Sequence, residues 1–155
     1  MMTDGSLAGG GRITILAKLL GYAGLLPQLF CVVALLSNSQ NSWFALSIGF
    51  GYAALIFSFL GGIWWGQAVA TGDARPLPYI AAVLPSLISL AAYLPWTLGW
   101  GWPGPSLIII GLCLIASPAA DRQLFGINGD WMTLRWHLSL GLGVMTVFLG
   151  VFAEV

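Results

Sequence analysis

The chain has 155 residues, of which 59% are hydrophobic and 6% are charged, and its five basic and five acidic side chains leave no net charge. A typical soluble domain is about a quarter charged, so this composition excludes a compact water-soluble fold, and the zero net charge gives no indication of nucleic-acid binding. We expect one domain surrounded largely by lipid, with the bilayer as its main partner.

Five apolar runs follow a polar, glycine-rich tail at residues 1–12, and together they predict a single domain over residues 13–155. All are long enough, or nearly so, to cross a hydrocarbon core about 30 Å thick. They cover residues 13–36, 43–70, 77–96, 105–119 and 131–152. Backbone groups in lipid must be hydrogen-bonded within their own segment, and these continuous runs lack the alternation of a β-barrel strand. The expected fold is therefore all-α, an integral membrane bundle of five transmembrane helices.

The first run contains a proline, Pro27, followed directly by a glutamine, Gln28. We expect the run to be kept as a span, because it is too long for a signal peptide and no small-residue cleavage site follows it. Pro27 removes one backbone hydrogen bond and predicts a kink. Gln28 must find a partner for its amide, and we favour a structural hydrogen bond over a ligand contact. Cys31 and Cys113 are expected to be packing residues.

The second run contains the stretch FSFLGGIWWGQ at residues 57–67. Its Gly62 and Gly66 have the G-x-x-x-G spacing that lets two helix backbones approach closely. Similar small surfaces occur on the first and fifth runs, at Gly21, Gly24, Gly141 and Gly143. We therefore expect the second helix to pack against the first or the fifth.

All basic residues of a five-span chain fall on one side of the membrane, and these residues are Arg12, Lys18, Arg75, Arg122 and Arg135. By the positive-inside rule that side is the cytoplasm or, in an organelle, the matrix. The N-terminus is therefore expected inside and the C-terminus outside. We expect a multi-pass protein of the bacterial inner (plasma) membrane.

The connection between the fourth and fifth runs, residues 117–130, is the longest polar segment after the tail. Pro118 is expected to end the fourth helix. Asp121 and Arg122 are then interpreted as a solvated pair, and Asp130 as a cap of the fifth helix. No ionisable residue is expected deep within the spans, which argues against an ion-coupled carrier.

Six polar and aromatic residues are expected at the same depth near the inner interface, namely Trp64, Gln67, Tyr79, Arg135, Trp136 and His137. If their helices are neighbours, they form a recess for a lipid headgroup, a quinone or another small amphiphile. The alternative is that Arg135 and His137 are interfacial side chains that reach the headgroups. A metal site is not expected, because His137 is the only histidine and has no acid beside it.

Three segments resemble one family of membrane proteins. They are GYAGLLP at residues 21–27, Phe59-Leu60-Gly61-Gly62 with Trp65-Gly66, and Leu134-Arg135. The sequence is similar here to a family of small uncharacterised membrane proteins, a domain of unknown function, that includes transmembrane protein 69. The resemblance implies a multi-span membrane protein and supplies no catalytic residues. It departs at Trp64, where relatives are expected to carry histidine.

The function expected from these observations is that of a non-enzymatic helix bundle that packs with itself or with other membrane proteins. The alternative is a binder or carrier of a lipid, quinone or other amphiphile at the inner interface. We expect no catalytic residue, no cofactor and no nucleic-acid partner.

Overall fold

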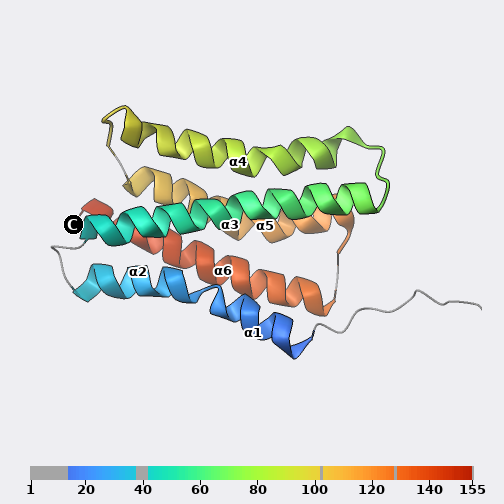
Figure 1. The fold of residues 1–155 in the computed structure, drawn as a ribbon, viewed down its shortest axis with the longest axis horizontal. Helices are drawn as coiled ribbons and strands as arrows, with labels where there is room; N and C mark the ends of the chain where they lie inside the picture. Colours follow the sequence, from blue (N-terminus) through green and yellow to red (C-terminus); the bar gives the residue numbers. More distant parts are fainter. Residues whose placement is uncertain (1–13, 38–41, 102, 128, 155) are drawn as a thin grey trace, which may run out of the picture.

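A computed structural model describes residues 14–37, 42–101, 103–127 and 129–154, so the predicted tail at residues 1–12 lies outside it. The elements are α1 (Ile15–Ala23), α2 (Leu26–Ser37), α3 (Ser42–Ala70), α4 (Pro76–Thr97), α5 (Gly104–Phe125), α6 (Asp130–Val151) and a 3-10 turn, η2 (Phe152–Glu154) (Figure 1). No strand occurs among these residues. Because α1 and α2 form one interrupted span, the described chain has five helical spans long and apolar enough to cross a membrane. The all-α prediction of a five-span membrane bundle is confirmed.

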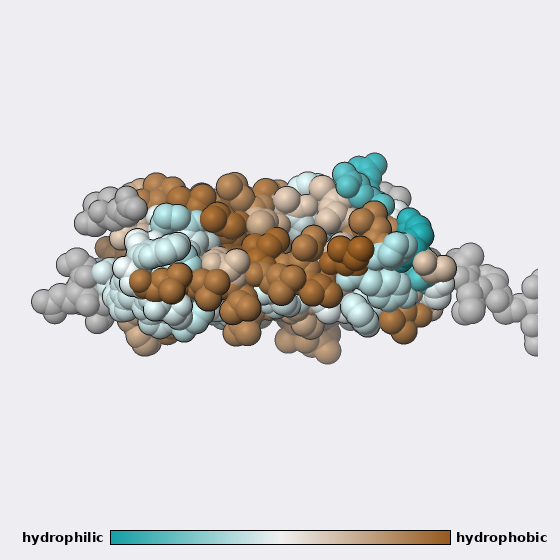
Figure 2. Space-filling model, turned by 90° about the horizontal axis from the view of Figure 1, so that it is seen from above, coloured by the Kyte–Doolittle hydropathy of each residue, from teal (hydrophilic) through white to brown (hydrophobic). Residues whose placement is uncertain are grey.

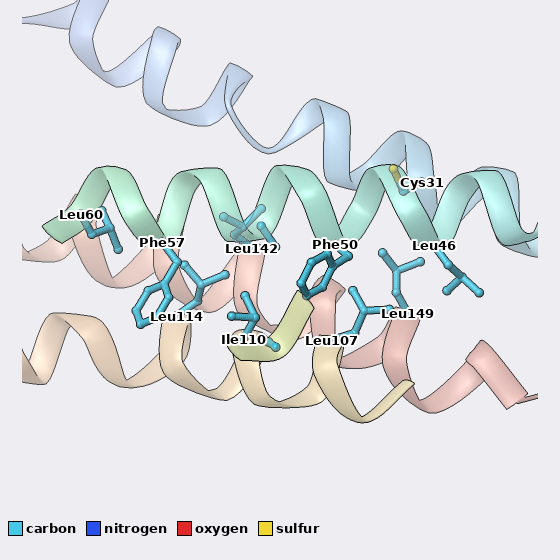
Figure 3. Packing of buried hydrophobic residues seen from close by; sticks show 12 residues of the cluster. Cys31, Leu46, Phe50, Phe57, Leu60, Leu107, Ile110, Leu114, Leu142 and Leu149 are labelled. Atoms are coloured by element: carbon cyan, nitrogen blue, oxygen red, sulfur yellow. The ribbon is translucent and has the colours of Figure 1, made fainter. Parts of the chain in front are cut away.

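The helices lie side by side as an elongated bundle (Figure 1). The most extensive contact joins α5 to α6, the next joins α3 to α4, and α2 lies against both α3 and α6. Phenylalanine and leucine side chains fill the space between α3, α5 and α6, with Phe50 and Phe57 extending from α3 toward α5 (Figure 3).

Large apolar side chains are exposed along the exterior of the bundle. Leu55 is 71% exposed, and every span exposes large aliphatic or aromatic side chains. Figure 2 shows hydrophobic residues across the middle of one face, with the most hydrophilic residues gathered toward one end. This surface suits hydrocarbon as the surrounding medium.

The first span is interrupted at Gly24–Leu25, as Pro27 predicts. Proline has no N–H, and its ring clashes with the carbonyl four residues earlier, which belongs to Ala23, the last residue of α1. Two hydrogen bonds between residues three apart, from Gly24 N to Gly21 O and from Leu25 N to Tyr22 O, tighten the turn before α2 begins. α1 therefore diverges from the axis of α2 (Figure 1).

The fourth helix is longer than predicted, because α5 continues through Pro118 to Phe125. Pro118 cannot donate to the carbonyl of Leu114, and the Ser117 hydroxyl donates to that carbonyl instead, at 2.8 Å. The helix ends where Gly126 adopts the left-handed conformation, with φ of 62°. The expectation of a polar loop over residues 117–130 was wrong, and the connection is residues 126–129. Asp130 is the first residue of α6 and not its cap, since Gly129 occupies the cap position.

Glycines allow the closest helix contacts, but only some of them are the glycines that the sequence predicts as packing positions. A Cβ on Gly61 would lie 2.2 Å from the Ala82 carbonyl oxygen, so Gly61 is where α3 approaches α4. Gly62 and Gly66 face open space. On α6, a Cβ at Gly143 would lie 2.7 Å from the Gly111 carbonyl oxygen of α5. Gly21 and Gly141 contact only leucine side-chain ends, and Gly24 has the Tyr52 hydroxyl nearby.

The bundle has one basic end. The start of α1, the α3–α4 connection and the α5–α6 connection lie at the same end (Figure 1). These segments and the helix ends that adjoin them carry Lys18, Arg75, Arg122 and Arg135, all the basic residues among those the structure describes. The side of the membrane that this end faces stays a prediction.

Candidate functional site

A buried ion pair joins α5 to α6 near the basic end. The Nε of Arg135 lies 2.8 Å from Oδ2 of Asp121, and the two side chains are 8% and 3% exposed. Because α5 remains helical beyond Pro118, Asp121 turns toward α6, while Arg122, about 100° further round the helix, is exposed. The interpretation of Asp121 and Arg122 as a solvated pair was therefore wrong. An ionisable pair does lie inside the bundle.

Further hydrogen bonds extend the ion pair across three helices. On α3, the indole N–H of Trp64 donates to Oδ1 of Asp121. On α6, Nη1 of Arg135 donates to the Ser139 hydroxyl at 3.2 Å, and this hydroxyl lies 3.2 Å from that of Ser117 on α5. Pairing and hydrogen bonding compensate two buried charges that would each cost several kcal/mol alone.

One donor of this network is left over. Nη2 of Arg135 is buried and has no hydrogen-bond partner among the residues that the structure describes. Oδ2 of Asp121 has the ion-pair contact with Arg135 but no hydrogen bond. A buried donor without an acceptor costs about 1–3 kcal/mol, and more when it is charged. Asp121 and Ser139 therefore hold the guanidinium in place, and its Nη2 remains free to donate a hydrogen bond.

A cavity of about 270 Å³ lies beside Arg135. Its walls come from the α1–α2 junction, α3 and α6, with a single residue from α5, and they are almost entirely apolar. The lining residues are Leu20, Gly21, Gly24, Leu25, Tyr52, Ile56, Phe59, Leu60, Ile63, Leu114, Trp131, Arg135, Leu138, Ser139 and Leu142. Apart from the indole N–H of Trp131, the polar side-chain groups of this lining belong to Arg135, Ser139 and Tyr52.

The outer wall of the cavity is α1, which has no buried residue along Ile15–Ala23. The Tyr52 hydroxyl of α3 donates to the Gly24 carbonyl at the junction, and it therefore holds the wall where the helix is interrupted. Nearer the basic end, the Tyr22 hydroxyl lies 3.1 Å from Nδ1 of His137 on α6. The interruption at Gly24–Leu25 and these two contacts define the space between α1 and the bundle.

The six residues expected to share a recess are distributed over several places. Trp64 and Arg135 meet through Asp121, and His137 contacts Tyr22. Trp136 is exposed, and Tyr79 packs edge-to-face on Trp65 with ring centroids 5.3 Å apart. Gln67 lines a separate hollow. Of the six, only Arg135 lines the 270 Å³ cavity.

The hollow at Gln67 is the polar counterpart of that cavity. It measures about 680 Å³ and includes Arg75 and Arg122. In the α3–α4 connection, Arg75 binds Asp73 through its guanidinium at 2.6 Å and also donates to the Leu124 carbonyl at 3.0 Å. The side-chain hydrogen bond from Arg75 lowers the pKa of Asp73 to about 2. Arg75 thereby ties this connection to the end of α5.

Sequence reasoning missed Asp121, Ser139 and Tyr52. A usable signal was present, because Ser117 and Asp121 are four residues apart, as are Arg135 and Ser139. Each pair lies on one face of a helix. The spacing becomes visible only once the helix is known to continue through Pro118.

Comparison with known proteins gives one match. The family model described as Protein of unknown function (DUF3429) matches residues 13–151. No curated protein and no solved structure matches the chain. The expected relation to a domain of unknown function is confirmed, and the link to transmembrane protein 69 stays a prediction.

Proposed function

We propose that the chain, which belongs to the DUF3429 family of proteins of unknown function, binds a single-chain amphiphile in the cavity between α1, α3 and α6. The polar head lies at Arg135, and the apolar chain lies along the α3 and α6 walls. The proposal is one of binding and includes no reaction.

The unpartnered nitrogen of Arg135 carries this proposal. Arg135 is buried, lines the cavity and retains a donor that no described residue satisfies. A ligand acceptor would remove the cost of leaving that donor unpaired. A bound water would serve the same donor, but only a ligand with an apolar part would also cover the apolar walls.

The dimensions of the cavity favour a slender ligand. Along α6 the lining runs from Trp131 to Leu142, roughly 16 Å at 1.5 Å per residue. The volume of about 270 Å³ is close to the lower end of ligand pockets, which measure roughly 300–1,000 Å³. A single acyl or prenyl chain fits this shape better than a two-chain lipid.

Native mass spectrometry of the full chain in mild detergent tests the proposal. The probes are three dodecyl compounds with different heads: dodecanoate, methyl dodecanoate and dodecylamine. We expect the unmodified chain to retain at least one of them. Ile56→Trp should reduce retention, because Ile56 lines the cavity and the larger ring would fill it.

Leu55→Trp is the matched control, since it makes a closely similar change one residue away on a side chain that is 71% exposed and does not line this cavity. Retention should be unaffected by it. Failure of the unmodified chain to retain any probe would contradict the proposal. Equal loss in both variants would do the same.

Self-association is a second candidate function, supported by Gly62 and Gly66. Both glycines are exposed, and a Cβ at either would meet nothing within 4 Å, so a smooth strip of α3 is left uncovered by this chain. Small residues of this kind allow close helix contact in membranes. Cysteine cross-linking at the two positions should give a dimer in native membranes, and its absence at both would remove this candidate.

A further inference from the structure

We infer that the head of the bound amphiphile is uncharged and carries a carbonyl acceptor, as in an ester or a quinone. The inference rests on the proposed function and narrows its ligand class. It follows from the charge balance around Arg135 and from which hydrogen-bonding groups of the cavity remain free.

The charge balance excludes an anionic head. Arg135 is already neutralised by Asp121 at 2.8 Å, and both side chains are buried. The other acids among the described residues are Asp73, which pairs with Arg75, Asp130 at the exposed start of α6, and Glu154 in η2 beyond the other end of α6. None of them lines the cavity, so none alters this balance from within it. A second carboxylate at the same guanidinium would bring an uncompensated negative charge into a medium where isolated charges cost several kcal/mol.

The free hydrogen-bonding groups exclude a cationic head as well. The free capacity of Arg135 consists of N–H donors, because a guanidinium has no acceptor. The Tyr52 hydroxyl donates to the Gly24 carbonyl, so its oxygen can still accept, but it carries no negative charge to compensate an ammonium. Ser139 already contacts both Arg135 and Ser117, and Oδ2 of Asp121, which accepts no hydrogen bond, belongs to a residue that does not line the cavity. An ammonium head would meet donors and a positive charge.

A carbonyl fits better than a hydroxyl for a related reason. A ligand hydroxyl could accept from Arg135, but its own O–H would then need a second acceptor at the same time, and the walls are almost entirely apolar. A carbonyl oxygen accepts without adding a donor, so it would satisfy the free donor of Arg135 and leave no new polar atom unpaired. The remaining walls, such as Leu138 and Ile63, then contact only hydrocarbon.

Dodecanoate and methyl dodecanoate form a test pair of the same chain length that differs in head charge. Their binding to the full chain in mild detergent is compared at about pH 9, where the carboxylate is ionised. We expect the methyl ester to bind at least about tenfold more tightly, a difference of about 1.4 kcal/mol. Equal or tighter binding of dodecanoate would overturn the inference but leave the proposed function standing.

Asp121→Asn provides a charge test of the same site. Without the carboxylate, Arg135 carries an uncompensated positive charge, and the preference should shift toward dodecanoate by about tenfold or more. Asp73→Asn is the matched control, because it removes the same charge from an exposed connection outside the cavity. It should leave the preference unchanged.

The outcomes separate the two proposals. If Asp121→Asn does not fold, the preference of the unmodified chain decides the inference alone. If Asp73→Asn shifts the preference as far as Asp121→Asn, the overall charge and not the Arg135 site governs selectivity, and the inference fails. If neither probe binds and Ile56→Trp changes nothing, both the inference and the proposed function fail.

Discussion

Two buried polar contacts hold α6 to its neighbours, and they differ in charge and in surroundings. Toward α2, Nε2 of Gln28 donates to the Thr146 hydroxyl at 2.9 Å, and that hydroxyl donates to the Leu142 carbonyl at 2.7 Å. Both side chains are fully buried. Toward α5, Asp121 and Arg135 form an ion pair beside the 270 Å³ cavity.

The difference assigns a structural role to the Gln28–Thr146 contact and a candidate binding role to the Asp121–Arg135 contact. Gln28 lies among tightly packed residues, because a Cβ on Gly49 would be only 3.6 Å from its Nε2 and 2.5 Å from Leu149. An uncharged hydrogen bond there fixes the position of α2, as expected for Gln28 from the sequence. Oε1 of Gln28 and Nη2 of Arg135 both lack a hydrogen-bond partner among the described residues, but of the two only Arg135 lines the 270 Å³ cavity. Charge next to a cavity is what makes the second contact a candidate binding site.

Breaking the charged contact should have the largest effect on stability. Asp121→Ala leaves Arg135 buried without its partner, and removal of one member of a buried pair typically costs about 3–5 kcal/mol. The free energy of unfolding is measured by SDS titration in mixed micelles. The double variant Asp121→Asn with Arg135→Gln should lose much less, since no buried charge remains. A loss as large as that of Asp121→Ala would show that the charge is not the cause.

The uncharged contact should be worth less. Thr146→Val keeps the side-chain shape but removes the hydroxyl, which leaves the fully buried Gln28 amide without this partner. We expect a loss of about 1–3 kcal/mol in the same titration. Thr133→Val, on the exposed start of α6, is the control for the substitution itself and should have little effect. Destabilisation of the Thr146 variant beyond that of Asp121→Ala would reverse the ranking of the two contacts.

The sequence predicts these two contacts to different extents, for physical reasons. Hydrophobic runs mark the spans because each is long enough to cross the bilayer, and Pro27 marks the interruption of the first. Pro118 was misleading, since the Ser117 hydroxyl replaces its missing donor and the helix continues. Asp121 therefore looked like a loop residue. The cavity was not predictable, because it depends on how far α1 diverges and on which side chains then fill the gap.

A third contact, an ion pair at the surface, extends the comparison, and its loss should have the smallest effect on stability. Asp73 and Arg75 lie 2.6 Å apart, but the Arg75 side chain is 61% exposed. Exposed pairs contribute little because water screens them. Asp73→Asn should therefore leave the SDS midpoint at neutral pH nearly unchanged, whereas Asp121→Ala shifts it strongly.

The acid dependence of this surface pair has a defined direction. The hydrogen bond from Arg75 lowers the pKa of Asp73 from 3.8 to about 2 in the folded chain. Its contribution to stability is therefore fully present above pH 3.8 and is lost as the pH falls through about 2. Carbon NMR of labelled aspartate should show a carboxyl titrating near that pH, and its disappearance in Asp73→Asn assigns the signal. A midpoint close to 3.8 would mean that Arg75 does not hold Asp73 in solution.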